Sequence, residues 1–96
     1  MAKKIIWTPR AQRNFNSIIN YLERKWDQRV TRNFINNSFG IIQILSENPL
    51  LGTLEIPEKR IYGFLLSKHK RMFYRYTKKE FIVLNIFDTR SNRSKV

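Results

Sequence analysis

The sequence predicts an α+β fold of order β-α-α-β-β-β, with an antiparallel helical hairpin packed on one face of a mainly antiparallel sheet. Two amphipathic segments fill the first half of the chain, and three β-branched or aromatic runs fill the second half. Helices and strands are therefore segregated along the chain rather than alternating, which is typical of this class. The length of 96 residues predicts one domain over residues 1–96.

The first predicted elements are a short strand and a long helix. The apolar run "KIIW" indicates a strand over about residues 4–7, which ends at Thr8-Pro9. Thr8 is a good N-cap, and Pro9 suits the first helical position, where the missing N–H costs nothing. The helix predicted over about residues 9–26 has one apolar stripe, formed by Ala11, Phe15, Ile18, Ile19, Leu22 and Trp26.

A second helix is predicted over about residues 28–47, with Asp27 as its N-cap and Asn48-Pro49 at its end. Its apolar face is wide and includes Val30, Phe34, Ile35, Phe39, Ile41, Ile42 and Leu45. Such a face should pack on both the first helix and the sheet. Gly40 lies in the helix interior, where a close approach of another element would explain it.

Residues 49–59 contain two prolines and one glycine and are predicted to form a loop. Strands follow over about residues 60–67, 71–77 and 80–87, and residues 88–96 form a basic tail. Alternation along the middle strand places Arg71, Phe73 and Arg75 on one face. The residue that follows each of them lies on the other face. If the helices cover one face, both arginines lie on the open face.

The charge is high and uneven. The chain has 19 Lys and Arg against 7 Asp and Glu, and residues 59–96 hold 11 of the basic residues but only 2 of the acidic ones. Such a field attracts polyanions, so DNA, RNA, an anionic membrane surface or an acidic protein could be the partner. With no cysteine and one histidine, disulfides and thiolate metal sites are excluded, and neither metal nor cofactor is expected. The sequence has no secretory or membrane-spanning signal, which predicts a cytoplasmic protein without a membrane partner.

Basic side chains interleaved with Tyr62, Tyr74 and Tyr76 form the candidate site. They could bind phosphates, because two arginines two residues apart on a strand can each grip an oxyanion bidentately. They could equally form a solvated strand whose long basic side chains prevent edge pairing. The candidates are Arg60, Lys68, His69, Lys70, Arg71, Arg75, Lys78, Lys79, Arg90, Arg93 and Lys95.

Several segments together resemble the RelE/ParE superfamily of bacterial type II toxin–antitoxin toxins over roughly residues 4–93. The matching segments are "WTPRAQRNF", "IINYLERKW", "FINNSFGIIQILSENPLLG", "HKRMFYRY" and "FIVLNIFDTR". The resemblance implies two antiparallel helices against an antiparallel sheet, which agrees with the order derived above. It also implies a small basic toxin that an acidic antitoxin neutralises.

Two branches of the superfamily give different targets. RelE-like members cleave mRNA on the ribosome, and in that alternative Arg71 and Arg90 would be catalytic, with His69 as a base. However, this chain has Tyr62 and Phe64 at about the positions where some RelE-like enzymes carry a pair of lysines. It also has Val96 at the position of their terminal aromatic residue. The absent lysines would remove phosphate contacts and a proton-transfer group.

ParE-like members, which poison DNA gyrase, resemble this chain better through "YLERKW", the long matched helices and the "ENPLLG" turn. The preferred hypothesis is therefore a ParE-like gyrase inhibitor. A RelE-like ribonuclease and a non-toxic nucleic-acid-binding domain remain as alternatives. The residues expected to bind the target or the antitoxin are Arg60, Lys68, Lys70, Arg71, Arg75, Arg90 and Arg93.

Overall fold

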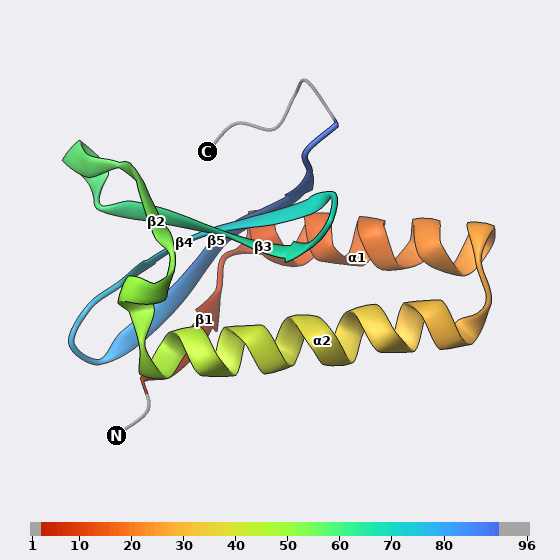
Figure 1. Cartoon of the computed structure of the whole chain (residues 1–96), viewed down its shortest axis with the longest axis horizontal. Coiled ribbons are helices and arrows are strands. Elements are labelled where there is room, and N and C mark those ends of the chain that lie inside the picture. The colour runs from red at the N-terminus through yellow and green to blue at the C-terminus, as the bar shows by residue number, and fades with distance from the viewer. Residues whose placement is uncertain (1–2, 91–96) are drawn as a thin grey trace.

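The computed structural model describes residues 3–90 and shows two helices lying against one five-stranded sheet (Figure 1). The helices and strands are β1 (Lys4–Trp7), α1 (Pro9–Lys25), α2 (Gln28–Glu47), β2 (Thr53–Ile56), β3 (Ile61–Ser67), β4 (Lys70–Tyr76) and β5 (Glu80–Asp88). Two short 3-10 turns, η1 (Pro49–Leu51) and η2 (Pro57–Lys59), flank β2.

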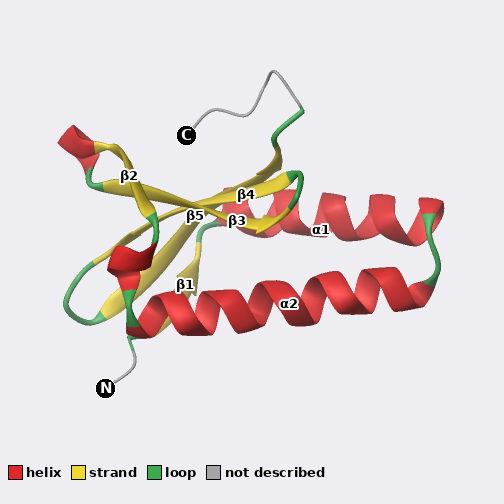
Figure 2. Cartoon of the chain, in the orientation of Figure 1, coloured by secondary structure: helices red, strands yellow, loops and turns green. Residues whose placement is uncertain are grey.

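The strands are arranged in the order β1-β5-β4-β3-β2. β1 runs parallel to β5, and the other three neighbouring pairs are antiparallel. Both helices lie on the same side of this sheet (Figure 2). The predicted α+β class, with a helical hairpin on one face of a mainly antiparallel sheet, is confirmed. The core between the layers consists mainly of Ala11, Phe15, Ile42, Leu45, Leu66, Met72, Tyr74, Phe81, Val83 and Ile86.

Thr8 connects the start of α1 to the sheet. Its hydroxyl oxygen accepts a hydrogen bond from the backbone N–H of Ala11 at 3.1 Å, which confirms the predicted N-cap. The same hydroxyl donates to the carbonyl of Leu84 on β5 at 3.1 Å. One side chain therefore both caps the helix and fixes its first turn beside β5.

The apolar stripe of α1 is buried only where the helix lies over the sheet. Ala11 and Phe15 are buried, whereas Trp26 is 60% exposed, contrary to its expected place on the packed stripe. The turn between the helices projects beyond the strands (Figure 1), so no sheet residue is available to cover Trp26. Periodicity correctly predicts the direction of the stripe but cannot show where the sheet ends.

The expectation of a close approach at Gly40 is wrong. A Cβ built on Gly40 would meet no atom within 4 Å beyond its chain neighbours and the backbone of its own helix, since this side of α2 is open. The neighbouring apolar residues Phe39 and Ile44 are also exposed. Gly40 therefore weakens the helix without making room for another element.

The segment predicted as a loop over residues 49–59 contains the edge strand β2. Thr53 pairs with Gly63, and Leu54 pairs with Tyr62 on β3. Three of the four residues of β2 are exposed, so the strand has no apolar alternation by which the sequence could reveal it. It forms because β3 offers an unpaired edge, and the prolines lie in the adjacent 3-10 turns rather than in the ladder.

Candidate functional site

The middle strand β4 has one face toward the core and the other on the open side of the sheet. Met72 and Tyr74 are fully buried against the helices. Arg71, Phe73 and Arg75 lie on the opposite face, as alternation predicts. Phe73 is nevertheless buried, because its ring packs against Phe87 with 5.1 Å between centroids. The two arginines are thus separated by an apolar pair.

Arg71 forms an ion pair with Glu55, which lies on the unpredicted strand β2. Both side chains are partly buried, at 25% and 28% exposure. Gly63 makes room for this pair, since a Cβ at that position would lie 2.9 Å from the Arg71 guanidinium and 3.0 Å from Glu55. Because local patterns do not reveal β2, the acidic partner of Arg71 could not be predicted from the sequence.

Asp88 binds two basic side chains at the end of β5. Its carboxylate accepts from Lys70 Nζ at 3.1 Å and from the Arg90 guanidinium at 2.7 and 3.0 Å. These contacts, with that of Arg90 the largest, hold the pKa of Asp88 well below its usual range and raise the pKa of Arg90. Lys70, expected on a binding surface, is instead buried with 9% exposure.

Arg71 and Arg90 therefore bind carboxylates on opposite faces of the sheet. Lys70 pairs with Asp88 across the ladder and lines a hollow with Asn33 and Phe34 of α2, on the helix side. Arg71 instead lines a hollow with Leu51, Thr53 and Leu65 beside β2. Arg71 pairs with Phe87 in the ladder and Arg90 follows the end of β5, and the two side chains reach different surfaces.

Lys68 and His69 lie in the turn between β3 and β4. Lys68 is exposed and His69 is half-buried. The His69 carbonyl accepts a hydrogen bond from the backbone N–H of Thr89 at 2.8 Å, so this turn is tied to the end of β5. Lys78 and Lys79 lie in the β4–β5 turn, and Arg93 and Lys95 are outside the described residues.

The three tyrosines form a stack rather than an open aromatic surface. The ring centroids of Tyr62 and Tyr74 are 5.6 Å apart, and those of Tyr62 and Tyr76 are 5.5 Å apart. Burial raises the pKa of Tyr74 to about 12. A side-chain hydrogen bond with Tyr62 raises the pKa of Tyr76. Tyr74 is thus a structural residue of the core.

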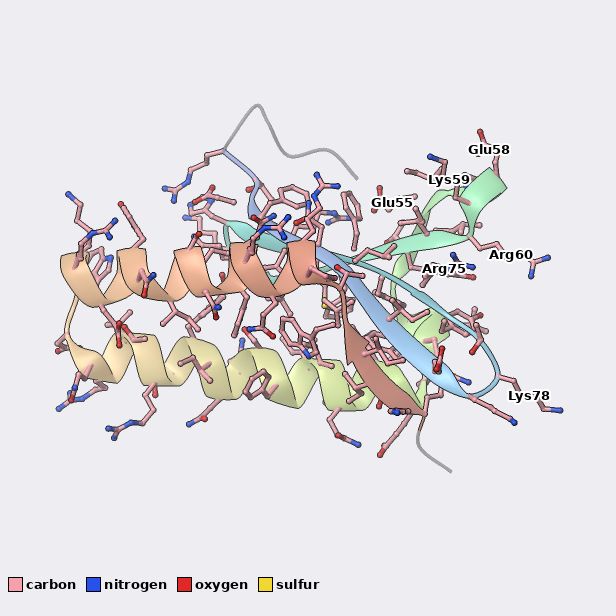
Figure 3. The ribbon with its side chains drawn as sticks, turned by 180° about the vertical axis from the view of Figure 1, so that it is seen from behind. Glu55, Glu58, Lys59, Arg60, Arg75 and Lys78 are labelled. Atoms are coloured by element: carbon pink, nitrogen blue, oxygen red, sulfur yellow. The ribbon has the colours of Figure 1, made fainter. Side chains whose placement is uncertain are left out.

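A larger groove of about 710 Å³ opens at the end of the sheet where β3 begins. Figure 3 labels four of its lining residues, Glu58, Lys59, Arg60 and Arg75. We call it the arginine groove; its lining residues are Thr8, Arg10, Glu58, Lys59, Arg60, Ile61, Arg75, Leu84 and Asn85. Arg60 and Arg75 were expected at a binding site, whereas Arg10 and Lys59 were not. No local pattern indicates Arg10, because the first turn of α1 reaches this place through contacts with β5 that are distant in sequence, including the hydrogen bonds of Thr8 to Leu84 and Val83.

Arg60 has a left-handed backbone conformation, with φ 54° and ψ 44°. It is the only non-glycine residue with positive φ in the part of the chain that the structure describes. In residues 3–90 no group of three His, Cys, Asp or Glu side chains is placed to hold a metal ion. None of the helices in that range is long and apolar enough to cross a membrane.

Comparisons with known proteins agree with this fold. A structure of the chromosomal ParDE toxin–antitoxin system from P. aeruginosa matches with a TM-score of 0.73 and 15% identity, covering 91% of this chain and 96% of that one. The RelBE2 complex from Mycobacterium tuberculosis matches with a TM-score of 0.60 and 18% identity, over 92% and 99% of the two chains. A YoeB/ParE toxin from Agrobacterium tumefaciens matches with a TM-score of 0.60 and 14% identity, over 88% and 96%.

These structural likenesses concern the fold, and the family is shown by the sequence itself. No curated protein sequence matches this chain. A family model described as the ParE toxin of the type II toxin–antitoxin system parDE matches residues 5–93. This range spans nearly all of the elements described above and confirms the resemblance to the RelE/ParE superfamily. The chain therefore belongs to the ParE toxin family of type II toxin–antitoxin systems.

Proposed function

We propose that this ParE-family protein arrests growth by inhibiting DNA gyrase and that an acidic antitoxin neutralises it. The observation that carries the choice of target is the separation of Arg71 and Arg90. Each guanidinium binds a carboxylate, Glu55 or Asp88, and the two carboxylates lie on opposite faces of the sheet. This arrangement supports a protein that binds its target through a basic surface rather than one that cleaves a phosphodiester.

A ribonuclease would need its cations directed at one phosphate, where they stabilise the charge that develops in the transition state. Arg90 uses both Nε and a terminal nitrogen to bind Asp88, so its bidentate edge already holds a carboxylate. Arg71 binds Glu55 through one terminal nitrogen. The RelE-like alternative therefore relies on two cations that are partly neutralised by carboxylates and are directed to different surfaces rather than to one phosphate.

The antitoxin part of the proposal is supported by charge. The net charge of +12 attracts an acidic protein over long distances and increases the rate of encounter. The similar RelBE2 structure is a toxin–antitoxin complex, and the similar ParDE structure comes from a toxin–antitoxin system. We infer that this chain also pairs with an antitoxin, in the cytoplasm where gyrase acts.

The proposal is tested by incubating the purified protein with gyrase and relaxed plasmid. We expect supercoiling to be inhibited and cleaved DNA to accumulate, and addition of the cognate antitoxin to restore supercoiling. Arg71→Ala/Arg90→Ala should weaken this inhibition only in part, because the other basic residues expected to bind the target remain. Unchanged supercoiling at excess toxin would contradict the choice of gyrase.

The same preparation distinguishes the two alternatives. A RelE-like enzyme would produce codon-positioned cuts in mRNA only when ribosomes are present, and Arg71→Ala/Arg90→Ala would abolish them. The matched control Arg24→Ala/Arg32→Ala removes the same charge from exposed helix positions. A non-toxic nucleic-acid-binding domain would leave growth unaffected and bind DNA with an affinity that falls steeply with salt.

A further inference from the structure

We propose that the arginine groove binds an extended acidic segment of a partner protein, with carboxylates on its basic rim and an aliphatic side chain on its floor. This inference rests on the proposed function for the identity of that partner, because the antitoxin is the acidic protein expected to bind. It goes further by assigning the place and the chemical pattern of the segment.

The rim of the groove is strongly cationic. Arg10 comes from α1, Lys59 and Arg60 come from the end of η2, and Arg75 comes from β4, against the single acidic residue Glu58. Figure 3 shows Lys59, Arg60 and Arg75 together at this end of the sheet. The ion pairs within residues 3–90 involve Lys70, Arg71 and Arg90, but neither Arg60 nor Arg75.

Guanidinium groups suit carboxylates because their planar donors match the two carboxylate oxygens. Arg60 and Arg75 are both exposed, so their donors are accessible to an incoming chain. Since they come from different elements, they can bind two successive acidic side chains that lie on the same side of an extended peptide.

The floor of the groove is apolar and fixed. Ile61 is buried, and Leu84 is half-buried and accepts the Thr8 hydrogen bond through its carbonyl. Asn85 beside it is buried and bonded to Asn14 at 2.6 Å. Side chains alternate along an extended peptide, so a segment that alternates acidic and aliphatic residues matches both parts of the groove.

The lining also favours a peptide over a nucleic acid. None of its residues is aromatic, whereas proteins that bind single strands stack the bases on aromatic rings. Glu58 is one of the lining residues, and its negative charge would repel a closely spaced row of phosphates. A peptide with a free backbone N–H can approach that carboxylate instead.

The left-handed conformation of Arg60 is a second, independent observation. For a residue with a side chain this conformation costs about 1–2 kcal/mol, and glycine or asparagine would adopt it more readily. Strained residues of this kind gather at functional sites. Arginine at this position therefore indicates that its guanidinium is needed at the rim.

The test measures fluorescence anisotropy of a short labelled peptide of alternating glutamate and leucine, titrated with the full-length protein. Arg60→Gln/Arg75→Gln is compared with Arg24→Gln/Arg32→Gln, which removes the same charge from exposed positions on the helices. We expect the groove variant to bind about tenfold more weakly for each arginine, as the loss of a charge-assisted pair implies. The control should bind within about twofold of the wild type.

Equal losses in both double variants would overturn the inference, because binding would then reflect overall charge. A peptide of alternating glutamine and leucine should bind much more weakly, and equal binding of this peptide would also contradict the inference. A short duplex DNA serves as the competitor. If it displaces the peptide, and its binding falls more than that of the peptide in Arg60→Gln/Arg75→Gln, the ligand is a nucleic acid instead. Circular dichroism melts show that each variant is folded, and Arg75→Gln alone tests the rim without changing the strained position.

The two proposals can fail separately. Loss of peptide binding in a protein that still inhibits gyrase would overturn the groove assignment alone. Peptide binding at the groove by a protein that leaves gyrase unaffected would overturn the choice of target alone.

Discussion

The hydroxyl of Tyr74 accepts a hydrogen bond from the backbone N–H of Gly52 at 3.1 Å and donates one to the carbonyl of Pro49. A core side chain of β4 thereby fixes the turn that leads into β2. A Cβ at Gly52 would clash with this hydroxyl and lie 2.9 Å from the carbonyl of Gly63. Since β2 supplies Glu55, the partner of Arg71, the position of that ion pair depends indirectly on Tyr74.

Tyr74→Phe removes both hydrogen bonds and leaves two backbone groups without their partner. We expect the free energy of unfolding at neutral pH to fall by about 1–3 kcal/mol, measured by urea denaturation. The pKa of Tyr74 is raised from 10.0 to about 12, so the folded protein keeps this proton where the unfolded chain loses it. Wild-type stability should therefore fall as pH rises from about 10 to 12, and the gap to the variant should narrow. A gap that stays constant over this range would contradict the assignment.

Gly40→Ala should stabilise the protein by about 1 kcal/mol, because alanine favours a helix interior more than glycine does. The added methyl group meets nothing within 4 Å, so no clash offsets this gain. Thermal unfolding gives the measurement. The matched control Gly52→Ala should be destabilised, since its Cβ has no room beside Tyr74. Destabilisation by both substitutions would indicate that α2 packs more closely at Gly40 than described.

The unfolding free energy of Asp88→Asn should fall less than that of the wild type as the pH is lowered into the acid range. The pKa of Asp88 is lowered by its bonds to Arg90 and Lys70, so its stabilising effect is present above the unfolded pKa of about 3.9. This effect is lost as pH falls through the lower folded value. The difference in unfolding free energy between wild type and variant should be largest above about pH 5 and shrink toward pH 2. Urea denaturation over this range checks it, and a difference independent of pH would exclude a titrating ion pair.

Arg60→Gly should separate the backbone strain from the role of the side chain. Glycine adopts the left-handed conformation without steric cost, so we expect unfolding free energy to stay the same or rise by up to about 1 kcal/mol. Binding of the acidic peptide should nevertheless weaken. Lys59→Gly is the matched control, because Lys59 lies in η2 with ordinary backbone angles, and glycine there should only destabilise. A loss of stability in Arg60→Gly equal to that of the control would show that the strain is not significant.

Local signals in the sequence predicted β1, the two helices and the three long strands, but not the edge strand β2. Thr8 and Asp27 cap the helices as expected, because a cap depends only on residues a few positions apart. β2 could not be predicted in this way, because its four residues are mostly exposed and it depends on pairing with β3. The exposure of Trp26 was missed for a related reason, since periodicity within a helix carries no information about the length of the sheet.

The candidate site shows the same limit. Alternation along β4 correctly placed Arg71 and Arg75 on the open face. Their surroundings could not be predicted, because Glu55 lies on the missed strand and Arg10 reaches the groove through a hydrogen bond between residues 76 positions apart. Lys70 is similar, since its burial follows from pairing with Asp88 rather than from its own sequence neighbours.

The two hydrogen bonds of the Thr8 hydroxyl also bear on how fast a ligand can associate. They join the first turn of α1 to β5 at Leu84, so one wall and the floor of the arginine groove are already in place before anything binds. A cavity assembled in advance requires no slow rearrangement on encounter. In stopped-flow mixing, the observed rate should therefore rise linearly with peptide concentration without reaching a plateau, and added salt should lower its slope.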